Sequence, residues 1–379
     1  MHEPVTAKGL RQFKIAFHAS LLASLVLGML WWLHEDYTVY YVEYWGKFID
    51  GEMTYVYPIG FLVFFSGLFR VNYFLPKLVF LSCHVMTAYQ VFRVLSRRAD
   101  FGKRELFSCA FFLFNPYTCV TSIYQGLFDP VIGFLVLNLV LLLEAKKGNP
   151  FLKDVVALLL IGVITSIKFV GVVVAIPFLI TRGKRVFMRR VVITVGGVFL
   201  VIAALALFDI QVSTILKPFF EQSARFMFTI YDIIQDKFGV PPPLFITAFR
   251  DFYGPIAVYV TVIALFSFDL LFFIKKFSIR LRVLLDILVF LTFFTVSNGQ
   301  FVIWFMPLFI LVHDEYSSTK RAMFNKMAIH QGYMGSFGFI APFGQFLNIF
   351  FIADIYKKEI AAKASASSIV APVVERATR

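Results

Sequence analysis

Residues 34–58, HEDYTVYYVEYWGKFIDGEMTYVYP, separate two apolar runs near the start of the chain. The run before them, residues 13–33, is long enough to cross a bilayer as a helix. Because charged groups are costly inside a membrane, this stretch is predicted to lie at a membrane boundary, where its acids are candidates for chemistry. It holds six tyrosines, one tryptophan and five carboxylates: Glu35, Asp36, Glu43, Asp50 and Glu52.

The composition indicates an all-α, polytopic membrane protein. The chain has 379 residues, of which 59% are hydrophobic and only 16% charged, and its mean hydropathy is +0.79. Soluble domains carry about 25% charged residues. Recurrent apolar runs of roughly 15–25 residues therefore predict a bundle of membrane-crossing helices.

The net charge of +13 does not point to nucleic acid. The Lys and Arg residues stand in short blocks between apolar runs, which is typical of cytoplasmic loops. No separate basic domain remains to bind a nucleic acid. The cysteines, Cys83, Cys109 and Cys119, lie in or beside apolar runs and do not suggest a disulfide framework.

Charge and length together predict about eleven crossings. Residues 1–352 are read as one transmembrane domain and residues 353–379 as a disordered tail. Residues 59–69 are too short to span, and a crossing there would carry the basic block after residue 95 to the outer side. They are therefore predicted to form an interfacial helix in the first outer loop.

Lys168 interrupts a long apolar run at residues 155–180. A single helix there would place the basic block of residues 182–190 outside, against the positive-inside rule. Two short helices meeting near Lys168 return that block to the cytoplasm, and broken helices bearing a charge line polar sites in membrane proteins. The alternative is a Lys168 side chain that reaches to the interface without a specific role.

With this topology several polar features lie on the outer face. They are the acidic loop with Glu35 and Asp36, the turn with Gln125 and Asp129, the break at Lys168, the break at residues 298–300 that includes Gln300, and Arg225 in a long loop. Carboxylates can supply a general base, and Lys or Arg can pair with a phosphate. Their common location predicts an enzyme that acts at the outer interface.

The order of these motifs resembles the GT-C glycosyltransferases that use polyprenyl-phosphate sugars. It looks most like the catalytic subunit of GPI mannosyltransferase I and related prokaryotic mannosyltransferases. The matching segments are HEDY at residues 34–37 with the Tyr-x-Pro of residues 55–58, the helix of residues 76–97, NPY and SIYQGLFD at residues 115–129, Lys168 with Pro177, and QFVIWFMP at residues 300–307. The resemblance covers roughly residues 30–312 and departs from the family at His34, where an Asp is usual.

The resemblance implies an inverting transfer of a hexose, with mannose as the first candidate, from a polyprenyl or dolichyl phosphate to a glycan or glycolipid acceptor. Asp36, with Glu35 beside it, would be the catalytic base. Lys168 and Arg225 would neutralise the leaving phosphate, and Asp129, Gln125 and Gln300 would bind sugar or acceptor. A divalent metal ion, Mg or Mn, and a small membrane subunit are further candidates. The host membrane is predicted to be a cell membrane, or the endoplasmic reticulum in a eukaryote.

Other interpretations remain open on sequence alone. Asp36 and Asp129 are also suitable helix caps, and Glu43, Asp50 and Glu52 suit an exposed helix face. The aromatic residues of the first loop suit a membrane-interface belt. A secondary transporter or flippase also uses broken helices that meet near a charge. A non-catalytic subunit would tolerate His34 in place of the acid.

Overall fold

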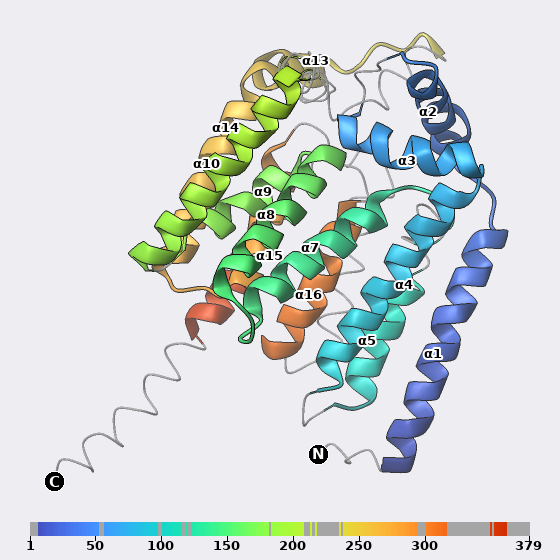
Figure 1. Ribbon diagram of the computed structural model, residues 1–379, viewed down its shortest axis with the longest axis vertical. Coiled ribbons are helices and arrows are strands. Elements are labelled where there is room, and N and C mark those ends of the chain that lie inside the picture. The colour runs from blue at the N-terminus through green and yellow to red at the C-terminus, as the bar shows by residue number, and fades with distance from the viewer. Residues whose placement is uncertain are drawn as a thin grey trace.

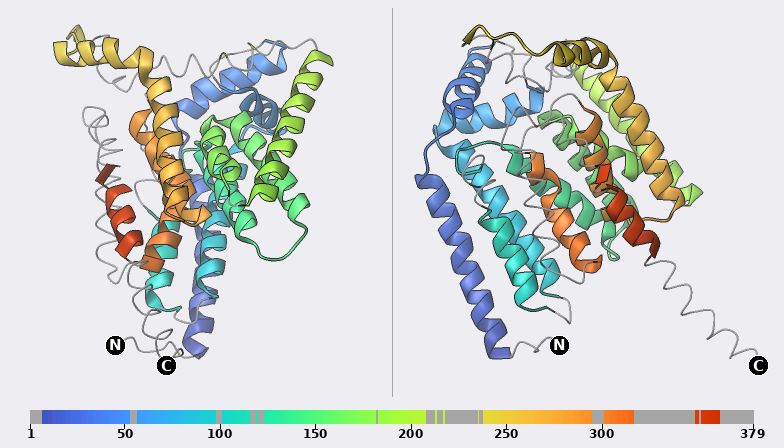
Figure 2. Two further views of the ribbon diagram at one scale, coloured as in Figure 1. Left: turned by 90° about the vertical axis from the view of Figure 1, so that its left-hand side faces the viewer. Right: turned by 180° about the vertical axis from the view of Figure 1, so that it is seen from behind.

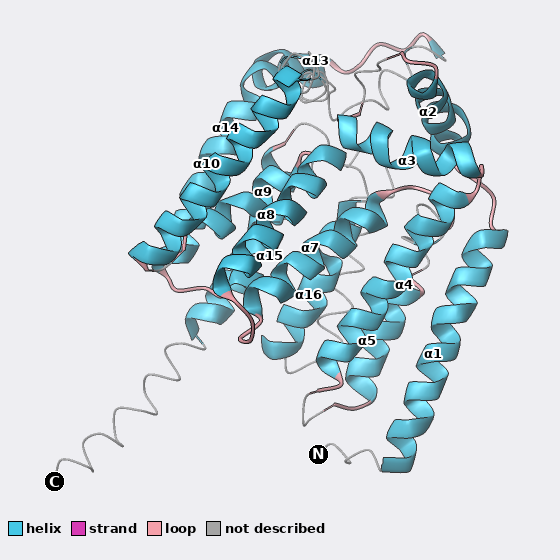
Figure 3. Cartoon of the chain, viewed as in Figure 1, coloured by secondary structure: helices cyan, strands magenta, loops and turns pink. Residues whose placement is uncertain are grey.

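The computed structural model describes residues 7–52, 57–97, 101–115, 119, 123–181, 183–207, 213, 217, 235, 238–294, 301–316, 349–350 and 352–361. Over these residues the chain forms helices joined by turns and loops, and contains no strand (Figure 3). This confirms the predicted all-α helical bundle. Most helices lie side by side, with α3 (Ile59–Val71) and α13 (Leu244–Tyr253) across one end (Figure 1).

The long helices follow the apolar runs of the sequence. Those that run along the bundle are α1 (Ala7–Leu30), α4 (Leu75–Leu95), α5 (Lys103–Leu113), α7 (Asp129–Glu144), α8 (Pro150–Ile167), α9 (Val170–Leu179), α10 (Lys184–Leu207), α14 (Ala257–Ile274), α15 (Ile279–Phe293) and α16 (Val302–Tyr316). Five described segments are long and apolar enough to cross a membrane: Arg11–Leu30, Leu75–Leu95, Pro150–Ile167, Lys184–Ala203 and Asp251–Ile274. The figure of about eleven crossings stays a prediction.

Proline begins several of these helices, because it lacks an N–H that the first turn would leave unpaired. Pro76, Pro130 and Pro150 all stand in the first turn of α4, α7 and α8. At α8 the Asn149 side chain also caps the helix by accepting the backbone N–H groups of Phe151 and Leu152. These local signals fix where each helix starts.

The bundle has two chemically distinct ends. We call the end that holds Asp36, Asp129 and Lys168 the site end. The opposite end, which we call the basic end, holds the arginines that pair with acids on neighbouring helices: Arg189, Arg190, Arg280 and Arg282.

The predicted break at Lys168 is present. Helix α8 ends at Ile167, Lys168 is extended with φ −155° and ψ 139°, and α9 begins at Val170. The two helices form a hairpin, since Arg190 contacts both Asp154 near the start of α8 and the Phe178 carbonyl near the end of α9. Lys168 is therefore at the tip of the hairpin, at the site end.

The short apolar segment that follows residues 34–58 forms a helix of its own, and its location at a membrane interface stays a prediction. Helix α3 (Ile59–Val71) lies across the ends of its neighbours rather than along them (Figures 1 and 2). It is too short to count among the five candidate spans. Its approach to α8 is close, because a Cβ on Gly60 would stand 2.5 Å from the Ser166 carbonyl oxygen.

The packing separates a central helix from an outer one. In α15 every residue from Leu281 to Thr292 is buried. In α10, no residue is buried in the most apolar part of the segment Lys184–Ala203, as expected of a helix that faces lipid. Part of the predicted disordered tail differs from expectation: residues 352–361 are helical, and Tyr356 places its ring 5.7 Å from that of Phe277.

Candidate active site

The loop that begins at residue 34 is held in place by the His34 side chain and backbone. The His34 backbone N–H donates to the Gln125 carbonyl oxygen at 2.9 Å, and the His34 Nδ1 accepts the backbone N–H of Asp36 at 3.0 Å. That second bond starts a one-and-a-half-turn π-helix, η1 (Asp36–Tyr41), which continues into α2 (Val42–Ile49). His34, where the resembling family has an acid, is therefore the residue that orients Asp36.

Gly126 lets the loop and the turn after α5 meet. Its φ is +86°, and a Cβ there would stand 2.9 Å from the Tyr37 ring. A larger residue would be strained in the backbone and would push Tyr37 away. The Tyr37 hydroxyl in turn donates to the Tyr73 carbonyl oxygen at 2.6 Å, which fixes η1 against the start of α4.

Asp129 lies at the first turn of α7 and is fully buried. Its Oδ1 accepts from Lys168 Nζ at 3.0 Å and from Trp304 Nε1 at 2.8 Å. Its Oδ2 is buried and has no hydrogen-bond partner within the described part of the chain. A buried carboxylate oxygen left without a donor is unfavourable, so this atom is poised to accept a hydrogen bond from a ligand.

Lys168 stands among three aromatic rings. Its Nζ is 4.2 Å from the centroid of Phe301, 4.7 Å from that of Trp304 and 4.8 Å from that of Phe128. Ring faces attract a cation, and the ion pair with Asp129 adds to that attraction. The Lys168 side chain is 14% exposed, so the ion pair is largely sheltered from solvent.

Asp36 lies near enough to the Asp129–Lys168 pair for both charges to affect the pKa of its carboxyl group. Burial raises the pKa of Asp36 above its ordinary value of 3.8, His34 lowers it, and the negative charges of Asp129 and Glu35 raise it. Lys168 has a smaller lowering effect on the same pKa. With 38% of its side chain exposed, Asp36 remains accessible to a substrate.

Aromatic side chains form the floor beneath Asp36. Tyr37, Tyr41 and Trp45 are each at most 1% exposed, and the Tyr41 ring lies 5.8 Å from that of Phe128. The expectation that the rings of this loop form an interface belt is wrong for these three. They pack inward because η1 and α2 sit directly on α3, whose Phe61 ring is 5.2 Å from Tyr41.

Not all the predicted site residues can be placed. Asp129 and Lys168 form an ion pair, and Asp36 lies near enough for both charges to affect its pKa. The Gln125 backbone carbonyl oxygen accepts the His34 N–H. Glu35 is exposed beside Asp36. Arg225 and Gln300 lie outside the described residues. Glu43 forms a surface pair with Lys47 one helical turn away, as the exposed-face interpretation predicts.

Trp304 is the site residue that the sequence did not single out. It occurs in QFVIWFMP, which was noted only for its resemblance to a family segment, and nothing in that segment indicates a partner in α7.

The side chains of the site also bear on the divalent metal predicted from the sequence. Among the described residues no group of three or more His, Cys, Asp or Glu side chains could hold an ion. We therefore derive no step through a metal.

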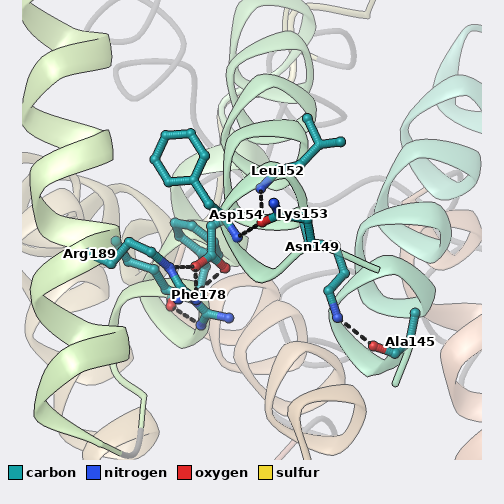
Figure 4. Close-up of polar contacts among 9 residues, drawn as sticks. Ala145, Asn149, Leu152, Lys153, Asp154, Phe178 and Arg189 are labelled. Atoms are coloured by element: carbon teal, nitrogen blue, oxygen red, sulfur yellow. Dashed lines mark hydrogen bonds and ion pairs between the residues drawn. The ribbon is translucent and has the colours of Figure 1, made fainter. Parts of the chain in front are cut away.

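A second polar cluster, at the basic end, holds the hairpin of α8 and α9 from below (Figure 4). Arg189 and Arg190 both pair with Asp154, and the Arg190 Nη1 also donates to the Phe178 carbonyl oxygen at 2.6 Å. Lys153 donates to the Ala145 carbonyl oxygen at 2.7 Å, closing the end of α7. These contacts fix the base of the helices that present Asp129 and Lys168.

Comparison with known proteins supports a membrane glycosyltransferase. Residues 55–230 match glycosyltransferase family 87, a membrane family of the GT-C type. The matched segment is just under half of the chain and contains Asp129 and Lys168, but neither Asp36 nor Trp304. No curated protein and no solved structure matches the chain.

Proposed function

We propose that this protein is an inverting glycosyltransferase that moves a hexose from a polyprenyl or dolichyl phosphate to a glycan or glycolipid. Mannose is the first sugar to test, and the reaction is placed at the extracytoplasmic or lumenal face. The observation that carries the proposal is the buried Asp129–Lys168 pair, whose charges act on the partly exposed Asp36. That pair lies inside the segment that matches a glycosyltransferase family.

Asp36 is the proposed general base. Its carboxylate removes the proton of an acceptor hydroxyl, and the resulting oxygen attacks the anomeric carbon of the donor sugar. The bond between that carbon and the phosphate oxygen breaks, and the lipid phosphate leaves with the electron pair. A base works best when its pKa approaches the working pH, and burial moves the pKa of Asp36 in that direction.

Lys168 and Asp129 are the proposed binding pair. Asp129 holds Lys168 through Oδ1 and keeps Oδ2 for a hydroxyl group of the sugar or acceptor. The ammonium of Lys168 then faces the leaving phosphate, with Arg225 as a second cation and Gln125 and Gln300 as further polar contacts. A well-placed donor to a developing anion contributes about 3–4 kcal/mol.

The test is transfer by purified protein reconstituted in liposomes. A radiolabelled polyprenyl-phosphate mannose is offered with a short glycolipid acceptor, and the corresponding glucose donor and a nucleotide sugar are run beside it. We expect transfer from a polyprenyl-phosphate donor and a loss of about 10²–10⁴-fold in Asp36→Asn. Full activity in folded Asp36→Asn would remove the base assignment.

Asp50→Asn is the matched control, because Asp50 is an exposed acid of the same loop. It should keep the rate of the unchanged protein. If the liposomes show no transfer from any donor but labelled lipid or solute crosses the bilayer, the protein is a transporter and the proposal fails.

A further inference from the structure

A second pair of buried acids lies far from the candidate active site, toward the basic end. Asp269 in α14 and Asp286 in α15 are both fully buried. Asp269 is matched by Arg282, whose Nε donates to Oδ1 at 2.7 Å and whose Nη2 donates to Oδ2 at 2.5 Å. The remaining Arg282 nitrogen, Nη1, donates to the Ile180 carbonyl oxygen at 2.7 Å. Each of the three Arg282 nitrogens thus makes one hydrogen bond to a described group, and two of these bonds go to Asp269.

Among the described residues, Asp286 has no hydrogen-bond donor, and both of its oxygens are buried. Its polar neighbour is the Asp269 carboxyl, which lies within hydrogen-bonding reach. Two ionised carboxylates side by side, with one arginine between them, would leave a net negative charge in an apolar core. Burial of such an unpaired charge is far more costly than taking up a proton.

No other described charge can balance Asp286. The charged groups that act on it are Asp269 on α14 and Arg282 on its own helix. Helix α7 also packs on α15, and its Glu144 is paired with Arg280. Helix α9 and residues 302–312 of α16, the other described segments that pack closely on α15, contain no charged residue.

We propose that Asp286 is a proton-binding site, and that its carboxyl O–H donates to Asp269 in the folded protein. The unit Arg282–Asp269–Asp286 is then neutral as a whole, and the protonated Asp286 oxygen gains a hydrogen-bond partner in Asp269. The proton bridges α14 and α15, while Arg282 links the same unit to the end of α9. This inference does not depend on the proposed transfer reaction.

The direct test is infrared spectroscopy of the purified full-length protein in detergent at pH 7. A protonated carboxylic acid has a C=O stretch that ionised carboxylates lack, and the band shifts in heavy water. We expect the band in the unchanged protein and the loss of its Asp286 component in Asp286→Asn. Because burial also favours the neutral form of the Asp36 carboxyl, Asp36→Asn identifies any second component and should leave the Asp286 component in place.

Absence of the band from the unchanged protein would overturn the proposal, and this measurement needs no variant. A band of unchanged strength in folded Asp286→Asn would do the same. Asp286→Asn is expected to fold, since its amide can donate to Asp269 as the acid does. Asp50→Asn, an exposed acid, should not alter the spectrum.

Thermal unfolding gives an independent measure. If Asp286 keeps a proton in the folded protein and releases it in the unfolded chain, this group raises the unfolding equilibrium constant about tenfold for each unit by which the pH rises. The melting temperature should therefore fall more steeply with rising pH in the unchanged protein than in Asp286→Asn. A bound metal cation in place of the proton would instead make the melting temperature depend on added Na⁺, K⁺ or Mg²⁺ only when Asp286 is present, and this result would contradict the proposal.

Discussion

At the scale of single residues, the candidate site depends on which hydrogen bonds the two oxygens of the Asp129 carboxylate accept. Oδ1 of Asp129 takes both available donors, from Lys168 and Trp304, and Oδ2 has none. Trp304 therefore acts through Asp129 and Lys168 rather than on substrate. We regard it as a positioning residue whose N–H and ring face have separable roles.

Trp304→Phe tests the N–H while it retains an aromatic ring beside Lys168. A hydrogen bond to a charged group contributes about 1.5–3 kcal/mol, so we expect sugar transfer to fall roughly tenfold or more. Trp45→Phe is the matched control, because the buried Trp45 Nε1 has no hydrogen-bond partner to lose. Equal rates for the two variants in the liposome assay would show that the Trp304–Asp129 bond is unimportant.

The charges around Asp36 predict the pH dependence of transfer. As a base Asp36 must be ionised, so the rate should rise with pH through its pKa, which burial holds above the ordinary value. Asp129 and Glu35 also raise this pKa. Asp129→Asn and Glu35→Gln should therefore move the rising limb of kcat/KM to lower pH. A limb that stays in place or moves upward in both variants would exclude Asp36 as the titrating base.

At the scale of elements, two contacts hold the site end together: the first loop on the turn before α7, and α3 on the tip of α8. Both depend on glycine. Gly126 has a positive φ against the Tyr37 ring, and Gly60 meets the Ser166 backbone directly. These are close backbone approaches, for which any side chain is too large.

Gly60→Ala should displace α3 from α8, because the new Cβ would stand 2.5 Å from a carbonyl oxygen that cannot turn aside. We expect a loss of about 1–3 kcal/mol in stability and a weaker donor affinity, since Ser166 is two residues from Lys168. Gly67→Ala in the same helix is the control, because a Cβ there meets no atom within 4 Å. Similar melting temperatures for the two variants would contradict this account of the contact.

The elements themselves could largely be predicted from the sequence. The break at Lys168 followed from charge on either side of one apolar run, and the position of α3 followed from its length. The pairing inside the site could not be predicted in the same way. Trp304 and Asp129 are 175 residues apart in the chain, and neither local pattern indicates the other. The inward packing of Tyr37 and Tyr41 was missed for the same reason, since it depends on where α3 lies.

At the scale of the whole molecule, the basic end anchors the helices whose other ends form the candidate site. Arg190 joins α10 to both arms of the α8–α9 hairpin, through Asp154 and the Phe178 carbonyl. Arg189 contacts only the Asp154 carboxylate among these groups and is more exposed, at 30% against 12%. The two neighbours in sequence thus have unequal structural roles.

Arg190→Gln should consequently be much more harmful than Arg189→Gln. Removing one partner of a buried ion pair costs about 3–5 kcal/mol, whereas a more exposed pair contributes about 0–1 kcal/mol. Loss of Arg190 also leaves the Phe178 carbonyl without its donor, so the hairpin should loosen and Lys168 should shift at the far end. We expect a lower melting temperature and a raised KM for the donor in Arg190→Gln, with both values nearly unchanged in Arg189→Gln. If both variants lose stability equally, Asp154 alone carries the contact, and the base of the hairpin does not position Lys168.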